Sequence, residues 1–211
     1  MPESGMPKAT PAVPLYLSPY VDARQRGEKG LRALLWPDER AQRLRFEALV
    51  RNCPLAGLRL LDAGCGRADL LGYLLERGIV PAHYTGLETV PATIRAARHR
   101  KYKRCKIIAG DFVREPEKLQ AGADVVIFCG SLNTLPHARF YQTLGAAWVA
   151  AGQWLAFNFL SSPLLGGEDW LFWHHRESVL AVCRSLGGEP HFDASYMTGD
   201  CTIVVRKPGA A

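Results

Sequence analysis

The sequence lacks any long uninterrupted apolar run. None of its stretches approaches the roughly 20 apolar residues that a helix needs to cross a bilayer. Its N-terminal stretch, MPESGMPKATPAVP, also lacks the apolar centre of a secretory signal. With 48% hydrophobic and 22% charged residues, the composition is that of an ordinary globular protein. We therefore expect a cytoplasmic protein with no membrane partner.

Closely spaced cysteine pairs are also missing. The six cysteines are scattered without a C-x-x-C pair, in a chain of 211 residues that is long enough to build a full core without cross-links. Reduced thiols are therefore expected rather than disulfides, and no metal is implied. The cysteines are Cys53, Cys65, Cys105, Cys129, Cys183 and Cys201.

A net excess of positive charge is missing outside one segment. The net charge of +6 is concentrated in RAARHRKYKRCK, residues 95–106, which holds seven Lys or Arg and no acid. The rest of the chain is close to neutral, so we interpret this segment as a solvated helix end and do not expect nucleic acid as a partner. Binding of a polyanion through the segment is the alternative.

The first part of the chain divides into a tail and a helical segment. Residues 1–14 carry four prolines and few large apolar groups, which predicts a disordered tail. From Asp38 onward, PDERAQRLRFEALVRN has apolar residues at helical spacing after a start signal. We therefore expect an N-terminal helical cap segment over residues 15–54, followed by a single domain over residues 55–211.

Apolar runs then alternate with helical stretches. The runs LRLLDAG, HYTGLE, CKIIAGD, ADVVIFCG and QWLAFNFL are separated by helical patterns, which predicts an α/β fold with a mainly parallel sheet and helices on both faces. The last two runs, HFDASYM and CTIVVRK, are joined by TGD alone. Three residues cannot make a crossover, so the sheet should end in an antiparallel hairpin.

A glycine turn follows the first strand. Gly64 and Gly66 would let the backbone approach a ligand, with the next helix directing its free N–H groups toward it. The dinucleotide pattern G-x-G-x-x-G is not met, because Asp69 replaces its third glycine, and Asp62 precedes the turn. These carboxylates would repel a pyrophosphate but favour an ammonium group. The pattern therefore favours an adenosine with a cationic amino-acid tail.

Two further acids end the next two strands. Glu88 closes HYTGLE and is placed to accept two ribose hydroxyls, and Asp111 closes CKIIAGD, where it could accept from the adenine amine while Phe112 packs on the ring. Either acid alone could equally be a helix cap. The ordered series of strand, D-x-G-x-G, strand, E, strand, GD is more specific.

These motifs resemble those of a known family. LLDAGCGRADLL, YTGLE, IIAGDF and ADVVIFCGSLNTL are similar to the successive motifs of class I, Rossmann-like S-adenosylmethionine-dependent methyltransferases, over about residues 55–206. The resemblance implies a seven-stranded sheet with its last strand antiparallel, and S-adenosylmethionine as cofactor. By the resemblance, the methionine end of the cofactor would contact Asp62, Gly64, Cys65 and Gly66, and the ribose would contact Glu88. The adenine would contact Asp111 and Phe112, and the transferred methyl would be flanked by Cys129 and Gly130.

The upstream segment is similar to one branch of small methyltransferases that carry a Tyr-rich entry and a W-x-x-x-x-x-Q-x-x-R-F pattern. Here the pattern is WPDERAQRLRF, so the resemblance implies that Trp36, Gln42 and Arg45 close over the cofactor, with Arg45 paired to its carboxylate. A solvated Arg45 is the alternative. The chain departs from the family at Ala68, where glycine is common; alanine is small enough to keep helix and strand close.

Acceptor-side residues are harder to choose. SLNTLPHARF lacks the [DNS]-P-P-[YF] signature of base-amine methylation, and the context F-C-G argues against a covalent cytosine mechanism. NFLSSPLLGGEDWLFWHH is long and aromatic, as is a pocket-lining loop, although it could equally pack on the sheet edge. Candidate catalytic residues are Asn133, His137 and His174, with His175 and Asn158 as further candidates.

The sequence thus predicts an S-adenosylmethionine-dependent methyltransferase acting on a small molecule at oxygen or nitrogen, by in-line transfer that needs no metal. Three alternatives stay open. They are an RNA or protein methyltransferase using residues 95–106, an NAD-dependent oxidoreductase, and a cofactor-binding regulatory protein without turnover. Neither the acceptor nor the oligomeric state follows from the sequence.

Overall fold

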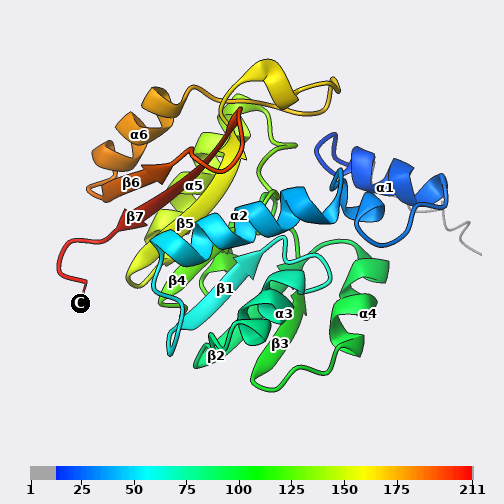
Figure 1. Ribbon diagram of the computed structural model, residues 1–211, viewed down its shortest axis with the longest axis horizontal. Helices are drawn as coiled ribbons and strands as arrows, with labels where there is room; N and C mark the ends of the chain where they lie inside the picture. The colour runs from blue at the N-terminus through cyan, green and yellow to red at the C-terminus, as the bar shows by residue number, and fades with distance from the viewer. Residues whose placement is uncertain (1–12, 211) are drawn as a thin grey trace, which may run out of the picture.

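A computed structural model describes residues 13–210 of the chain (Figure 1). Of the tail predicted over residues 1–14, residues 1–12 lie outside the described part. Within residues 13–210, no helix combines the length and the apolar character that crossing a bilayer requires.

Seven strands form one sheet in the order β3-β2-β1-β4-β5-β7-β6. All neighbouring pairs are parallel except the two that involve β7, which runs antiparallel to both β5 and β6. The predicted α/β class, the mainly parallel sheet and the closing hairpin are therefore confirmed. The strands are β1 (Arg59–Ala63), β2 (His83–Glu88), β3 (Cys105–Ala109), β4 (Val125–Phe128), β5 (Trp154–Leu160), β6 (Glu189–Asp193) and β7 (Asp200–Arg206).

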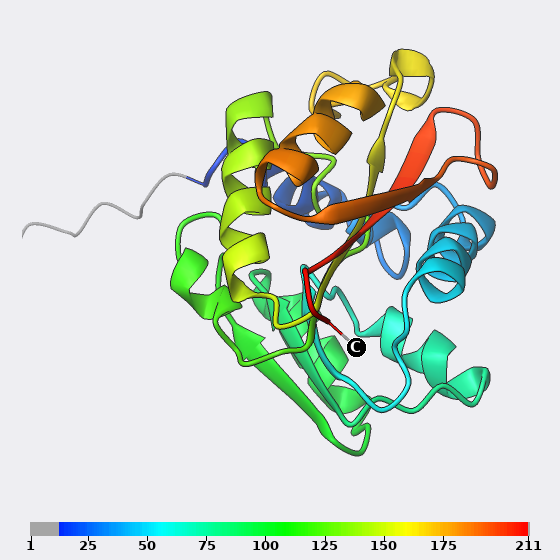
Figure 2. The same cartoon turned by 90° about the vertical axis from the view of Figure 1, so that its left-hand side faces the viewer.

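Helices cover both faces of the sheet (Figure 2). Buried side chains of α2, α3 and α4 share one apolar cluster on one face, and those of α5 and α6 share a second cluster on the other. The α-helices are α1 (Ser18–Gln25), α2 (Glu39–Asn52), α3 (Asp69–Glu76), α4 (Pro91–His99), α5 (His137–Ala150) and α6 (Arg176–Ser185). Short 3₁₀ turns are η1 (Arg32–Leu34), η2 (Pro116–Leu119) and η3 (Pro163–Leu165).

The central strands are apolar along almost their whole length because helices bury both of their faces. Every residue of β4 is buried, and so is all of β1 after its first residue. The parallel register pairs Asp62 with Gly86 and Ile127, and Glu88 with Ala109. It therefore brings the carboxyl ends of β1, β2, β3 and β4 to one edge, where open α/β sheets bind ligands.

An N-terminal segment reaches over this edge. We call residues 13–52, which comprise α1, η1 and α2, the N-terminal cover. Its long helix α2 begins where the sequence pattern predicted, because the Asp38 carboxylate accepts a hydrogen bond from the Ala41 N–H at 2.7 Å and caps the first turn. Arg24 of α1 donates to the Thr93 hydroxyl of α4, which ties α1 to the sheet domain.

Candidate functional site

A cavity lies at the carboxyl edge of the sheet, beneath the N-terminal cover. Every residue that the sequence analysis assigned to a cofactor lines this cavity, as does Asn133 of the three catalytic candidates. Those cofactor candidates are Trp36, Arg45, Asp62, Gly64, Cys65, Gly66, Glu88, Asp111, Phe112, Cys129 and Gly130.

The glycine turn forms a floor with no room for a side chain. Gly64 has a φ of +78°, and a Cβ there would lie 2.4 Å from the Cβ of Ser131. The Ser131 hydroxyl donates to the Ala63 carbonyl at 2.7 Å, which fixes the opposing wall. Packing against Ser131 therefore requires glycine at position 64, and the contact of this turn with a ligand stays a prediction.

Asp62 is the least satisfied carboxylate of the site. The residue is 2% exposed, and its Oδ2 accepts a hydrogen bond from the Tyr84 hydroxyl, while its Oδ1 has no partner within residues 13–210. Burial, opposed by the hydrogen bond from Tyr84 and reinforced by the charges of Glu88 and Asp69, raises the pKa of Asp62 to about 7. An unpaired buried carboxylate is costly, so this position favours a cationic ligand group.

Glu88 is held by backbone groups. Its Oε2 accepts from the Gly66 N–H at 2.9 Å, and its Oε1 accepts from the N–H groups of Thr89 and Val90, each at 2.8 Å. Burial raises the pKa of Glu88, opposed by these three hydrogen bonds. An ionised carboxylate offers about four acceptor positions, so Glu88 keeps capacity for a ligand hydroxyl.

The Asp111 carboxylate makes a capping contact and also lines the cavity. Its Oδ1 accepts from the Val113 N–H at 2.9 Å, which is the capping contact. Its Oδ2 accepts from the Tyr16 hydroxyl at 2.6 Å. Phe112 lines the cavity beside it and packs edge to face on Phe128, with ring centroids 5.3 Å apart. The tyrosine contact ties the N-terminal cover to the end of β3.

Arg45 has a protein partner that the sequence analysis did not foresee. Its guanidinium donates to the carboxylate of Asp200, which is fully buried at the start of β7 and also accepts from the Tyr196 hydroxyl. The same guanidinium lies over the ring of Trp36, 5.0 Å from the centroid. The structure shows Arg45 paired with Asp200, whereas its pairing with a cofactor carboxylate stays a prediction.

The turn after β4 is covered by Trp36. Gly130 has a φ of +74°, and a Cβ there would lie 3.0 Å from the Trp36 ring. The Gly130 N–H donates to Asn158 Oδ1 at 3.0 Å, and the Asn158 amide donates to the Arg45 carbonyl at 3.4 Å. Asn158, a further catalytic candidate, therefore links three elements and does not line the cavity.

The three catalytic candidates separate in space. Asn133 lines the cavity, and its Oδ1 accepts from the Leu160 N–H at 3.3 Å. His137 and His174 are not among the residues that line it. Their Nδ1 atoms lie 3.0 Å apart, and His174 stacks on Phe140 with ring centroids 3.7 Å apart. Burial lowers the pKa of His174 to about 4, with His137 contributing. This pair holds α5 against the residues before α6.

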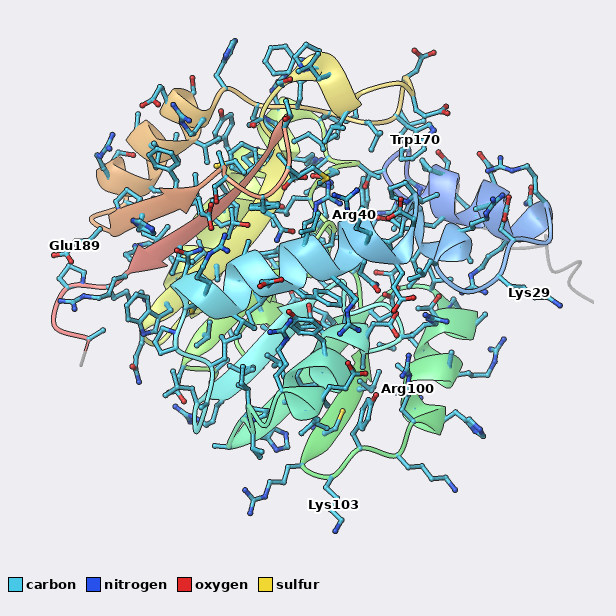
Figure 3. All side chains as sticks on the ribbon, in the orientation of Figure 1. Lys29, Arg40, Arg100, Lys103, Trp170 and Glu189 are labelled. Carbon is cyan, nitrogen blue, oxygen red and sulfur yellow. The ribbon has the colours of Figure 1, made fainter. Side chains whose placement is uncertain are left out.

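The aromatic loop, residues 161–175, contributes to the cavity through only part of its length. Trp170 and Leu171 line the cavity, whereas Phe172 and Trp173 do not. The Phe172 N–H donates to the Asn133 carbonyl at 2.8 Å, which anchors the loop to the turn after β4. Figure 3 labels Trp170 on the part of the loop drawn nearest to α1.

Several lining residues escaped the sequence analysis. Tyr16, Leu17 and Tyr20 come from the start of the N-terminal cover, and Thr134 comes from the turn after β4. The four-residue spacing of Tyr16 and Tyr20 was a weak signal, because two tyrosines one helical turn apart are also common on packed helices. Leu35, another lining residue, has a φ of +61°, a strained backbone conformation for leucine.

The basic segment contributes no lining residue, although one of its side chains contacts a residue that lines the cavity. Arg100 pairs with the lining residue Asp69, and Arg98 donates to the Ile107 carbonyl at 2.9 Å. Figure 3 shows Arg100 near the end of α4 and Lys103 pointing outward where β3 begins, which is the opposite end of that strand from Asp111. None of the Lys or Arg residues in residues 95–106 lines the cavity.

Comparisons with known proteins agree on the fold. Residues 55–143 match a family model described as "Methyltransferase domain". No curated protein sequence matches the chain. The magnesium protoporphyrin IX methyltransferase from Synechocystis PCC 6803 with bound SAH has a TM-score of 0.64 at 16% identity, over 91% of this chain and 96% of that one.

Two further structures are similar at the same level. A DhpI–SAM–HEP complex has a TM-score of 0.65 at 13% identity, covering 90% of this chain and 94% of that one. The complex between the Haloferax volcanii Trm112 methyltransferase activator and the putative methyltransferase has a TM-score of 0.66 at 16% identity, covering 92% of this chain and 97% of that one. The Rossmann-like fold predicted from the strand and glycine pattern is therefore confirmed.

Proposed function

We propose, from the premise that this chain is a class I methyltransferase, that it binds S-adenosylmethionine in the cavity and transfers its methyl group to a small-molecule acceptor at oxygen or nitrogen. The premise rests on the methyltransferase-domain match and the shared fold. S-adenosylmethionine is the cofactor of this class, and structures with the same fold contain SAM or SAH. The cofactor supplies an electrophilic methyl group on a sulfonium.

The unpaired oxygen of Asp62 carries the proposal. A buried carboxylate with an open acceptor atom, at the edge of a glycine turn, fits the ammonium group of an amino-acid tail. It does not fit a pyrophosphate, because the buried Asp62 carboxylate lines this end of the cavity and would repel it. Asp62 therefore favours S-adenosylmethionine over a dinucleotide.

The remaining carboxylates fit the rest of the cofactor. Glu88, with capacity beyond its three backbone donors, accepts ribose hydroxyls. Asp111 accepts from the adenine amine, and Phe112 packs against the ring. Cys129 and Gly130 lie at the methyl end, beneath Trp36. These assignments follow the order in which the strands end along the sheet edge.

The location of the cavity supports a small-molecule acceptor. The N-terminal cover and the aromatic loop both contribute lining residues, so an acceptor is enclosed rather than laid across an open groove. An RNA acceptor would need the basic segment, but none of its Lys or Arg residues lines the cavity, and Lys103 lies at the other end of β3. Enclosure holds nucleophile and methyl group in line and excludes water, which is most of what methyl transfer requires.

Isothermal titration with S-adenosylmethionine and S-adenosylhomocysteine tests the proposal. Both should bind the wild-type protein, and Asp62→Asn should weaken binding about 30-fold or more, because it removes one charge of a buried ion pair worth about 2 kcal/mol or more. Asp124→Asn is the matched control, since Asp124 pairs with Arg59 at the amino end of the sheet and should leave affinity unchanged.

Thermal melts of all three proteins establish that each variant is folded. A folded wild-type protein that binds neither ligand would contradict the proposed function. Equal affinity in Asp62→Asn and the wild type would contradict the assignment of Asp62 to the ammonium group.

A further inference from the structure

The acceptor end of the cavity is built from carbon-rich side chains. Under the proposed function, the methyl group is delivered next to Gly130, and the Trp36 ring packs directly on this glycine. Of the apolar residues that line the cavity from the N-terminal cover and the aromatic loop, we call Leu17, Leu35, Trp36, Trp170 and Leu171 the acceptor wall. Leu34, which packs on Gly66, and Phe46 also line the cavity and are not counted in it. Two tryptophans and three leucines favour a flat apolar body over a polar one.

The cavity lining contains no histidine or lysine within the described part of the chain. Without these residues, the remaining candidate bases are the four carboxylates that line the described cavity. Three of the four already accept hydrogen bonds or ion pairs from fixed donors. Glu88 accepts from three backbone N–H groups, Asp111 from Tyr16 and the following turn, and Asp69 from Arg67 and Arg100. The fourth, Asp62, faces the cofactor ammonium in the proposed complex.

The other polar groups of the cavity donate protons or are already paired. The Tyr16 hydroxyl donates to Asp111, and the Arg45 guanidinium pairs with Asp200. Burial raises the pKa values of Tyr20 and of the Cys65 and Cys129 thiols, so all three stay protonated at neutral pH. The side-chain oxygen of Asn133 accepts a hydrogen bond from the Leu160 N–H, and the side-chain nitrogen can act only as a donor. Among the lining groups of residues 13–210, none is available to take a proton from an acceptor.

From this inventory we propose that the acceptor is an apolar aromatic molecule whose reacting oxygen is already ionised, an acidic phenolate or an aromatic carboxylate. This inference rests on the proposed function and narrows it. In the transfer step, the anionic oxygen forms a bond to the methyl carbon while the bond from that carbon to the sulfonium sulfur breaks. The electron pair stays on sulfur, both products are neutral at the reacting atoms, and no proton has to leave.

Charge neutralisation suits this enclosed wall. An anion and a sulfonium lose their charges together as the transition state forms, so a dry apolar site favours the transition state over the charged reactants. The Asn133 amide nitrogen can donate to the anionic oxygen and orient it. An aliphatic alcohol would need a general base, whose absence costs about 10²-fold or more in rate.

Methyl transfer to three matched naphthalene probes tests the acceptor class. The probes are 6-cyano-2-naphthol, the less acidic 2-naphthol, and 2-naphthylmethanol, each with S-adenosylmethionine across pH 6 to 10. We expect 2-naphthylmethanol to react about 10²-fold more slowly or not at all. We also expect the rising limb of the rate to follow the ionisation of each phenol, and therefore to lie at lower pH for the cyano compound.

A rising limb at one pH for both phenols would reveal a general base in the enzyme and overturn the proposal. Comparable rates for the alcohol would do the same, and so would methylation of none of the probes by a protein that binds S-adenosylmethionine. Titration with S-adenosylmethionine alone separates these results from failure of the proposed function, because a protein that does not bind it fails at the earlier step.

A binding measurement checks the acceptor wall without turnover. With S-adenosylhomocysteine present, 2-naphthol should bind about tenfold more weakly to Trp170→Ala than to the wild type, since a buried aromatic contact is lost. Trp173→Ala is the matched control, because Trp173 lies three residues away in the same loop and does not line the cavity. Equal loss of affinity in the two variants would contradict the assignment of Trp170 to the acceptor wall.

Discussion

The floor of the cavity and its covering segments are built by different means. The floor consists of the strand ends that carry Asp62, Glu88 and Asp111, each placed by the parallel register of adjacent strands. The N-terminal cover reaches the site through contacts distant in sequence, such as Tyr16 with Asp111, 95 residues apart, and Arg45 with Asp200, 155 residues apart. Local pattern therefore specifies the floor and the helix α2 of the cover, whereas tertiary packing specifies how the cover contacts the floor.

The largest effect should come from the buried pair that ties the cover to β7. Arg45→Met leaves the fully buried Asp200 carboxylate without its guanidinium partner, and breaking such a pair costs about 3–5 kcal/mol. The free energy of unfolding from urea titration should fall by that amount. The double variant Arg45→Met with Asp200→Leu should recover much of the loss, because no charge stays buried.

This measurement decides whether Arg45 chiefly stabilises the fold or chiefly binds the cofactor. A change in unfolding free energy below about 0.5 kcal/mol in Arg45→Met, together with a large loss of S-adenosylmethionine affinity, would mean that the Asp200 contact is secondary. It would also restore the carboxylate-binding function that the sequence pattern predicted.

The floor should make the affinity for S-adenosylmethionine depend on pH through Asp62. The pKa of Asp62 is about 7 without ligand, so below pH 7 the carboxyl is protonated and must release its proton to pair with an ammonium group. Affinity for S-adenosylmethionine should therefore weaken by up to about tenfold per unit as the pH falls below 7. Titrations between pH 5.5 and 8.5 measure this, and Asp62→Asn should flatten the profile.

Stability should change in the opposite sense in the same pH range. The pKa of Asp62 is raised above its unfolded value near 3.8, so the folded state binds more protons between about pH 4 and pH 7. The unfolding free energy of the unliganded protein should therefore fall as the pH rises through this window, and Asp62→Asn should reduce the slope. A wild-type affinity that is constant with pH would indicate that Asp62 stays ionised without ligand.

The sequence predicted the sheet and the floor because both repeat short-range rules. Apolar runs with helices between them give parallel strands, and an acid directly after such a run must lie at the shared edge. The same rules could not select His137 or His174, since their mutual contact outside the cavity depends on how α5 meets the residues before α6. They also gave no partner for Arg45, whose Asp200 lies on the last strand.

Ala68 holds a backbone conformation of the floor that does not suit its residue type. Its substitution should change the unfolding free energy least. Ala68 is fully buried before α3 with a φ of +58°, a left-handed conformation that costs a non-glycine residue about 1–2 kcal/mol. Ala68→Gly relieves this strain, while the more flexible unfolded chain offsets about 0.5–1 kcal/mol. The net stabilisation in urea should be about 0.5–1 kcal/mol. Ala97→Gly, the same substitution in the regular helix α4, should instead destabilise by about 1 kcal/mol. Equal destabilisation by the two variants would mean that the turn before α3 is not strained, because the two substitutions differ chiefly in backbone conformation.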